Sequence, residues 1–204
     1  MWFYTYFFGS FVGSSLATLC YDLFINRNKL YKREKNETLE CVKNIAPNIA
    51  FNLIAITAPY SYFLESYIDD KERNDYGLVI NFFLYFVSAD FFNYFVHLAF
   101  HKIIYLKYFH LQHHEFIYPI GMAALYGHPI DYFFVNLLPF TAPIYILYPP
   151  DYVIKIVLTI ALANTVILAH GSYAYLNSQH LLHHKYFNGN YGLGLLDKIM
   201  GTDL

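Results

Sequence analysis

The sequence has little charge and little cysteine, and each shortage excludes a class of protein. Charged residues make up 14% of the 204 positions, against about 25% in an average soluble domain. The two cysteines, Cys20 and Cys41, are too few for a disulfide scaffold or a cysteine-based zinc site. The net charge is −2, whereas a nucleic-acid-binding protein presents a basic face. We therefore expect no nucleic-acid partner.

Apolar residues are abundant instead, and they fall into long runs. Hydrophobic residues make up 57% of the chain and aromatic residues 21%, which is typical of a membrane protein. A helix needs about 20 consecutive, mostly apolar residues to cross a bilayer. Five stretches reach or approach that length: 1–26, 45–68, 78–100, 132–148 and 152–176. The sequence therefore predicts an all-α fold, an integral-membrane helical bundle of about four to five spans.

The charges between these stretches predict how the chain is oriented. Six basic residues lie between the first two stretches: Arg27, Lys29, Lys32, Arg33, Lys35 and Lys43. Residues 69–77 carry more acidic than basic side chains. Cytosolic loops are enriched in lysine and arginine, so we expect residues 27–44 to be cytosolic. Counting spans forward places 101–131 and 177–204 on the same side of a multi-pass membrane protein.

The ten histidines are the feature that most needs an explanation. All of them lie between positions 97 and 184: His97, His101, His110, His113, His114, His128, His170, His180, His183 and His184. The first two are four residues apart, and two triplets repeat an i, i+3, i+4 spacing that places side chains on neighbouring points of a helix. The predicted topology brings all ten to the cytosolic side, as a histidine-rich helical cap.

Imidazole is a ligand for zinc, copper, iron and nickel, and neutral histidine is available near pH 7. One tetrahedral metal needs four ligands, so eight to ten histidines fit two metals with open positions. Taken alone, His128 or His170 would more often be a hydrogen-bonded core residue. The three clusters on one face indicate a metal site. A membrane protein that only handles metal, without redox chemistry, is the alternative, although its histidines should be spread along a path across the membrane.

Two polar residues precede His97 on the same predicted helix face. Asp90 lies seven residues before it and Asn93 four residues before it. A charge deep in a span is expensive, so we expect Asp90 to accept the second N–H of a ligand histidine. We take Asp90 and Asn93 as candidate catalytic residues, with a helix-packing role as the alternative for Asp90. Three further carboxylates adjoin the histidine segments as weaker candidates: Glu115, Asp131 and Asp197.

The order of these motifs resembles the fatty acid hydroxylase superfamily of integral-membrane, histidine-rich di-iron oxygenases, over about residues 80–203. The similarity is strongest to its sterol 4-methyl oxidase branch. Its elements are the HxxxH, HxxHH and HxxHH motifs, residues 113–122, Gly127-His128-Pro129, His170-Gly171-Ser172-Tyr173, and an ending from His183-His184 through Asn190-Tyr191-Gly192 to Asp197–Asp203. The chain departs from the family pattern at Leu98, Leu125 and Leu196, which affects substrate choice more than the metal ligands.

The resemblance implies two iron ions, with zinc possible in a purified form, bound by the ten histidines. It implies O₂-dependent oxidation of a membrane lipid, with electrons from NAD(P)H through cytochrome b5 or a similar carrier. The specific expectation is sterol 4-methyl hydroxylation in sterol biosynthesis, in the endoplasmic reticulum. Fatty-acyl or sphingolipid hydroxylation, sterol desaturation and a non-catalytic metal-binding role remain alternatives. We divide the chain into N-terminal spans and a basic loop (1–77) and a fatty acid hydroxylase-like catalytic domain (78–204).

Overall fold

The computed structural model describes residues 2–24, 35–69, 71–116, 120–170 and 178–204. All regular secondary structure in these ranges is helical, which confirms the predicted all-α fold. Most of the basic residues that set the predicted orientation, and residues 171–173 of the family resemblance, lie outside the described residues.

Four helices are long and apolar enough to cross a membrane, by length and composition, among the residues that the structure describes. They run over Leu39–Asp69, Leu78–Lys102, Pro129–Leu147 and Asp151–Ala169, in agreement with four of the five predicted stretches. The first stretch forms a helix of 23 residues, Trp2–Phe24, but it is not one of the four.

Three of these four helices are composite, because each contains a π-helical segment. The elements in chain order are α1 (Trp2–Phe24), α2 (Lys35–Phe51), η1 (Asn52–Thr57), α3 (Ala58–Asp69), α4 (Leu78–Lys102), α5 (Ile104–His110), η2 (His113–Glu115), η3 (Gly121–Leu125), α6 (Pro129–Asp131), η4 (Tyr132–Leu137), α7 (Leu138–Leu147), α8 (Asp151–Ala163), η5 (Asn164–Ala169), α9 (Ser178–Tyr186) and α10 (Leu195–Met200). Among them η1, η4 and η5 are π-helical. Such segments often occur at functional sites.

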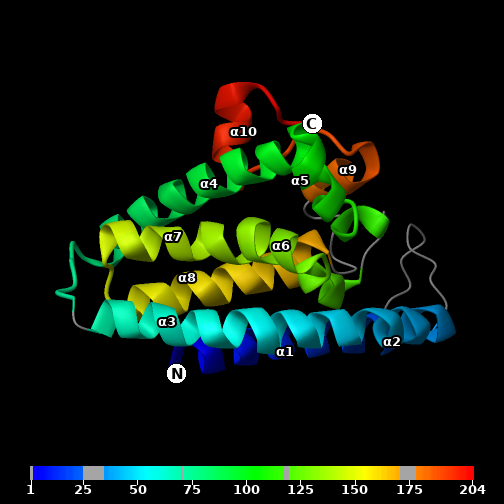
Figure 1. The fold of residues 1–204 in the computed structure, drawn as a ribbon, viewed down its shortest axis with the longest axis horizontal. Helices are drawn as coiled ribbons and strands as arrows, with labels where there is room; N and C mark the ends of the chain where they lie inside the picture. The colour runs from blue at the N-terminus through cyan, green and yellow to red at the C-terminus, as the bar shows by residue number, and fades with distance from the viewer. Residues whose placement is uncertain (1, 25–34, 70, 117–119, 171–177) are drawn as a thin grey trace.

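The long helices run beside one another, and the short ones gather at one end (Figure 1). Helix α1 contacts α8, η5 and α3, whereas α4 contacts α7 and α8. Helices α5, α9 and α10 lie together around the C-terminal half of α4 (Figure 1). The arrangement therefore brings the ends of several helices, with most of the histidines, to one end of the bundle.

One hydrophobic core joins the two halves of the chain. Helix α1 buries Phe3, Phe7 and Phe11, which the i, i+4, i+8 spacing places on one face. The same core includes Ile45 of α2 and Val157 of α8. The segments before and after residue 77 thus share one core.

Polar side chains link the helices within this core. The hydroxyls of Thr57 and Tyr132 lie 2.6 Å apart, and Tyr85 donates to the Phe140 carbonyl at 2.5 Å. Asn48 pairs with both backbone groups of Gly127, donating at 3.1 Å and accepting at 3.2 Å. Hydrogen bonds of this kind hold membrane helices together, because lipid offers no alternative partner. The bond to Gly127 fixes the loop that follows the HxxHH segment of residues 110–114.

Candidate metal centre

Nine of the ten histidines form two neighbouring groups. The first histidine group consists of His97, His101, His110, His114 and His183. The second histidine group consists of His113, His170, His180 and His184. In each group the ligand nitrogens all lie within 4.8 Å of one another, so each group could hold a metal ion.

The HxxHH spacing divides each triplet between the two groups. His110 and His114 both enter the first group, whereas the intervening His113 enters the second. In α9 the assignment is reversed, because His180 and His184 enter the second group and His183 the first. Residues four apart share a helix face, whereas adjacent residues point about 100° apart. Two such triplets on facing elements therefore build two sites rather than one.

The nitrogens of the first group are spaced as ligands of one metal would be. Six Nε2–Nε2 distances among its five rings fall between 2.9 and 3.3 Å. Two nitrogens bound about 2.0–2.1 Å from the same metal lie about 2.9–3.4 Å apart at angles from 90° to 109°. In the second group, the Nε2 atom of His180 lies 3.1 Å from those of His170 and His184.

The hydrogen bonds of the rings fix which nitrogen carries the proton. The Nδ1–H of His97 donates to the Tyr191 carbonyl at 2.8 Å, and that of His183 donates to the Gly189 carbonyl at 2.6 Å. A carbonyl oxygen can only accept, so in the neutral rings Nε2 bears the lone pair. These lone pairs converge within the first group, where they would repel one another without a cation. The donor set therefore fits a metal ion.

The second group shows the same pattern. His113 donates from Nδ1 to the Tyr126 carbonyl at 3.0 Å. His170 donates from Nδ1 to the Thr165 carbonyl at 2.8 Å. Thr165 begins the last turn of the π segment η5, whose carbonyls are offset from those of a regular α-helix. This turn orients His170 towards the second group.

Burial keeps the rings neutral. Desolvation lowers the pKa of His110, His170 and His183 to about 3. It also lowers the pKa of His114 and His184 well below the ordinary histidine value, and the neighbouring histidines lower it further. Neutral imidazole is the form that binds a metal.

The first and second histidine groups lie next to each other, since the ring centroids of His114 and His184 are 4.5 Å apart.

A carboxylate supports one of the histidines, but it is Asp131 rather than Asp90. The Nδ1–H of His110 donates to Asp131 Oδ1 at 2.6 Å, and both side chains are fully buried. Asp90 instead accepts from the backbone N–H groups of Leu193 and Leu196, at 2.5 and 2.8 Å. The role expected for Asp90 is wrong, because the face of α4 that carries it contacts α10 and the loop before it rather than a histidine.

Asp90 and Asp197 together shape the loop that holds two of the rings. Asp197 accepts from the N–H groups of Tyr191 and Gly192, both at 2.7 Å. These bonds set the backbone beside the Tyr191 carbonyl that orients His97. A Cβ at Gly192 would lie 2.6 Å from Asp90 Oδ1, so the close approach requires glycine.

The remaining candidates lie elsewhere. His128 is outside both groups: its Nδ1 accepts from the Ile130 N–H at 3.2 Å, and its ring lies 4.5 Å from that of Phe109. It therefore caps the start of α6. Glu115 accepts from the Tyr126 hydroxyl at 2.7 Å, and Asn93 is half-buried beside His97 in a small cavity.

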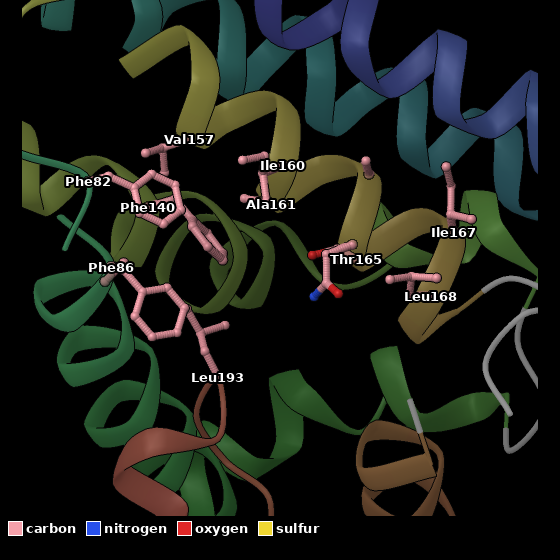
Figure 2. A pocket seen from close by; sticks show the side chains of 13 residues that line it. Phe82, Phe86, Phe140, Val157, Ile160, Ala161, Thr165, Ile167, Leu168 and Leu193 are labelled. Carbon is pink, nitrogen blue, oxygen red and sulfur yellow. The ribbon is translucent and has the colours of Figure 1, made fainter. Parts of the chain in front are cut away.

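One cavity is lined by histidines, and a second, apolar cavity lies next to it. The smaller, of about 100 Å³, is lined by members of both groups, including His97, His113 and His170. The larger, of about 560 Å³, is apolar and lies between α4, α7 and α8. Figure 2 shows Phe82 and Phe86 at one end of this space and Leu168 at the other.

The backbone acceptors of the site could not be identified from the sequence. Four histidines are oriented by carbonyl groups, those of Gly189, Tyr191, Tyr126 and Thr165. A carbonyl belongs to every residue and so leaves no signature in the amino-acid letters. Only the nearby glycine and aspartate residues hint at a constrained loop.

Comparison with known proteins gives a consistent result. Residues 82–202 match the fatty acid hydroxylase family. The chain is 30% identical to fatty acid hydroxylase domain-containing protein 2 of Homo sapiens, over 97% of this chain and 63% of that protein. It is 32% identical to methylsterol monooxygenase 1 of Gallus gallus, over 83% of this chain and 64% of that protein.

A Delta(7)-sterol 5(6)-desaturase of Gibberella zeae is 30% identical to this chain, over 97% of the chain and 61% of the desaturase. The chain thus spans less than two thirds of the length of these relatives. No solved structure matches it.

Proposed function

Because this chain belongs to the fatty acid hydroxylase family, we propose that it catalyses the O₂-dependent oxidation of a C–H bond in a membrane lipid. The specific reaction we propose is hydroxylation of a sterol 4-methyl group in sterol biosynthesis. The observation that carries the proposal is the pair of neighbouring histidine groups beside an apolar cavity of about 560 Å³. The similarity to a methylsterol monooxygenase supports the choice of substrate.

The first and second histidine groups would each hold one iron ion, and zinc could replace iron in a purified form. The two irons, when bound, would supply the activation of O₂. The residues around them position the rings: Asp131 and the backbone carbonyls hold each Nδ1–H, which leaves Nε2 free to bind. Phe187 lies against His101 and His114, with ring centroids 4.6 and 4.4 Å apart, and shields this side from water.

The apolar cavity would hold the body of the lipid. Its lining includes Phe82, Phe86 and Phe140, and several residues also line the smaller cavity beside the histidines. The lipid could therefore present one end to the metals while the rest stays out of water. We propose that residues 78–204 form the catalytic domain, that the histidine groups face the cytosol at the endoplasmic reticulum, and that electrons arrive from NAD(P)H through cytochrome b5 or a similar carrier.

Two kinds of alternative follow from the same features. A fatty-acyl or sphingolipid hydroxylase, or a sterol desaturase, would use the same two histidine groups on a different lipid bond, and the similarity to a sterol desaturase favours this second candidate. A non-catalytic metal-binding protein would bind metal at the same groups without turnover.

The proposal is tested by metal content and turnover of the detergent-purified chain. We expect about two metals per chain and NADH- and O₂-dependent conversion of a 4-methylsterol, given a reductase and cytochrome b5. A product that gains one oxygen atom indicates hydroxylation, whereas a product that loses two hydrogens indicates desaturation.

A His113→Ala/His183→Ala double variant removes one ligand from each group, and it should lose both metals and turnover. One metal or none in the wild-type chain would overturn the oxygenase proposal. Two metals without turnover of any lipid would favour the non-catalytic alternative.

A further inference from the structure

Four asparagines line the small cavity beside the histidines, and three of them come from the long helices. Asn93 comes from α4, Asn136 from η4 and Asn164 from η5, and all three line the cavity of about 100 Å³ together with members of both histidine groups. Each is half-buried. In the part of the chain that the structure describes, none of the three carboxamides has a hydrogen-bond partner.

Unpartnered carboxamides are unusual inside membrane-spanning helices. Asn93 lies in the span Leu78–Lys102, Asn136 in Pro129–Leu147 and Asn164 in Asp151–Ala169. An amide taken out of water without a partner is costly, and lipid cannot replace the lost hydrogen bonds. Asn52 differs from them, since its amide NH₂ group donates to the carbonyls of Leu125 and Gly127 at 3.3 and 3.2 Å. The three cavity asparagines therefore have carboxamide groups available to bind a partner from outside the chain.

The cavity that these asparagines line adjoins the apolar one. Phe140, Asn164, Thr165 and Leu193 line both cavities. Figure 2 shows the side chains of Phe140, Thr165 and Leu193 around the apolar space. A molecule with an apolar body in the larger cavity would thus place one end among the asparagines, beside His97 and His170.

The charge of the residues that line the two cavities restricts which chemical group of a bound molecule can lie among the asparagines. No lysine or arginine lines either cavity among the described residues. The one carboxylate, Asp197, is already engaged by the Tyr191 and Gly192 N–H groups and by the Thr202 hydroxyl at 2.8 Å. A carboxylate or phosphate would have to shed water with no lysine or arginine to pair with it, which is expensive. An uncharged group carries no such cost.

We propose that Asn93, Asn136 and Asn164 form a polar subsite that binds an uncharged hydroxyl of the lipid substrate, next to the carbon that reacts. A hydroxyl offers one donor and two acceptor positions, and carboxamides can satisfy both kinds. This inference rests on the proposed function, because it assumes that the lipid occupies the apolar cavity. It narrows the substrate class to lipids with a hydroxyl close to the oxidised carbon, such as a sterol with a hydroxyl on the ring carbon beside its 4-methyl group.

Direct binding tests the subsite without requiring turnover. The probes are a radiolabelled 4-methylsterol with a free 3-hydroxyl and its 3-deoxy analogue, bound to the detergent-purified full chain. We expect the wild-type chain to bind the hydroxyl form about tenfold or more tightly, because the deoxy form leaves buried amides unpaired. Asn164→Leu and Asn136→Leu variants should reduce that preference to about twofold or less.

Thermal stability separates a binding role from a structural one. Leucine is close in size to asparagine and needs no partner, so the cavity variants should keep or raise the midpoint of thermal unfolding. An Asn52→Leu variant is the matched control, because it removes a carboxamide that is hydrogen-bonded within the chain. It should lower the midpoint and leave the preference for the hydroxyl unchanged in the protein that remains folded.

Three results would overturn the subsite: an unchanged preference in both leucine variants, a wild-type chain that does not discriminate between the two sterols, or tighter binding of oleate than of oleyl alcohol. Failure of the proposed function would look different. It would appear as missing metals or missing turnover, whereas sterol binding and its dependence on Asn136 and Asn164 are measured independently of both.

Discussion

Replacing Asp131 with asparagine should weaken one metal site and spare the other. Asp131 is the one carboxylate bonded to a histidine among the described residues, and it serves His110 of the first histidine group. In Asp131→Asn the side chain keeps its shape, and its carbonyl oxygen can still accept from Nδ1–H. The negative charge that makes His110 a stronger ligand is lost.

The size of the expected loss in metal affinity follows from the burial of the hydrogen bond between Asp131 and His110. Removing a partner of this kind costs about 10–100-fold in metal affinity, or about 1.4–2.7 kcal/mol. The 2.6 Å bond between two fully buried groups places the expected loss near the upper end of that range, because no solvent screens the pair. The second group should be affected much less, since backbone carbonyls orient His113 and His170, and Asp131 acts on His113 through its charge alone.

The assay is metal content after dialysis against a graded series of chelator concentrations. We expect the wild-type chain to lose its two metals over a similar range, and Asp131→Asn to lose one metal at about 10–100-fold lower chelator strength. Glu115→Gln is the control, because Glu115 is exposed and contacts the Tyr126 hydroxyl rather than a histidine. Equal weakening of both metals, or no weakening of either, would refute the assignment of Asp131 to one site.

Three further predictions concern the loop, the lone histidines and pH. Gly192→Ala should lower the free energy of unfolding by about 2–3 kcal/mol, because its Cβ would lie 2.6 Å from Oδ1 of Asp90, whose two carboxylate oxygens are each held by a backbone N–H group; a thermal midpoint equal to wild type would contradict this. His170→Ala should lose the metal of the second group, whereas His128→Ala should keep both metals, as measured by elemental analysis. Burial lowers the pKa of His170 to about 3, below the unfolded value of about 6.5, so the unfolded chain binds more protons between these values. The free energy of unfolding of the metal-free protein should therefore fall as the pH drops from about 6.5 towards 3, and a midpoint that rises on acidification would contradict it.

The spacing of residues along the sequence predicts those features of the structure that depend on a single helix. The apolar runs predict four of the long helices, since length and composition suffice for a span. The first run, which includes Trp2–Phe24, forms a helix of 23 residues that is not among the four candidate spans of the described residues. The HxxHH spacing likewise indicates a binuclear site, because i, i+4 partners share a face and the residue between them does not.

Contacts between distant elements decide the features that spacing leaves open. His128 and His170 are both isolated histidines in the sequence, yet one caps α6 and the other enters the second group. The difference arises in η5, where a π turn places the Thr165 carbonyl 2.8 Å from His170 Nδ1. A one-residue change in helical register of this kind has no reliable sequence signature, because its energy depends on the helices packed around it.

The two aspartates show why proximity along a helix is a poor guide to function. Asp90 is on the helix that carries His97, two turns away, but a side chain two turns along a helix is about 10 Å distant and cannot reach the same ring. Asp131 is 21 residues from His110 in sequence and 2.6 Å from it in space. The site is assembled from α4, α5, α9 and the loops between helices. A carboxylate that accepts from a ligand histidine therefore comes from whichever element packs against the ring nitrogen that points away from the metal. Asp131 meets that condition because α6 contacts α5, and no property of residues 90–101 could have shown it.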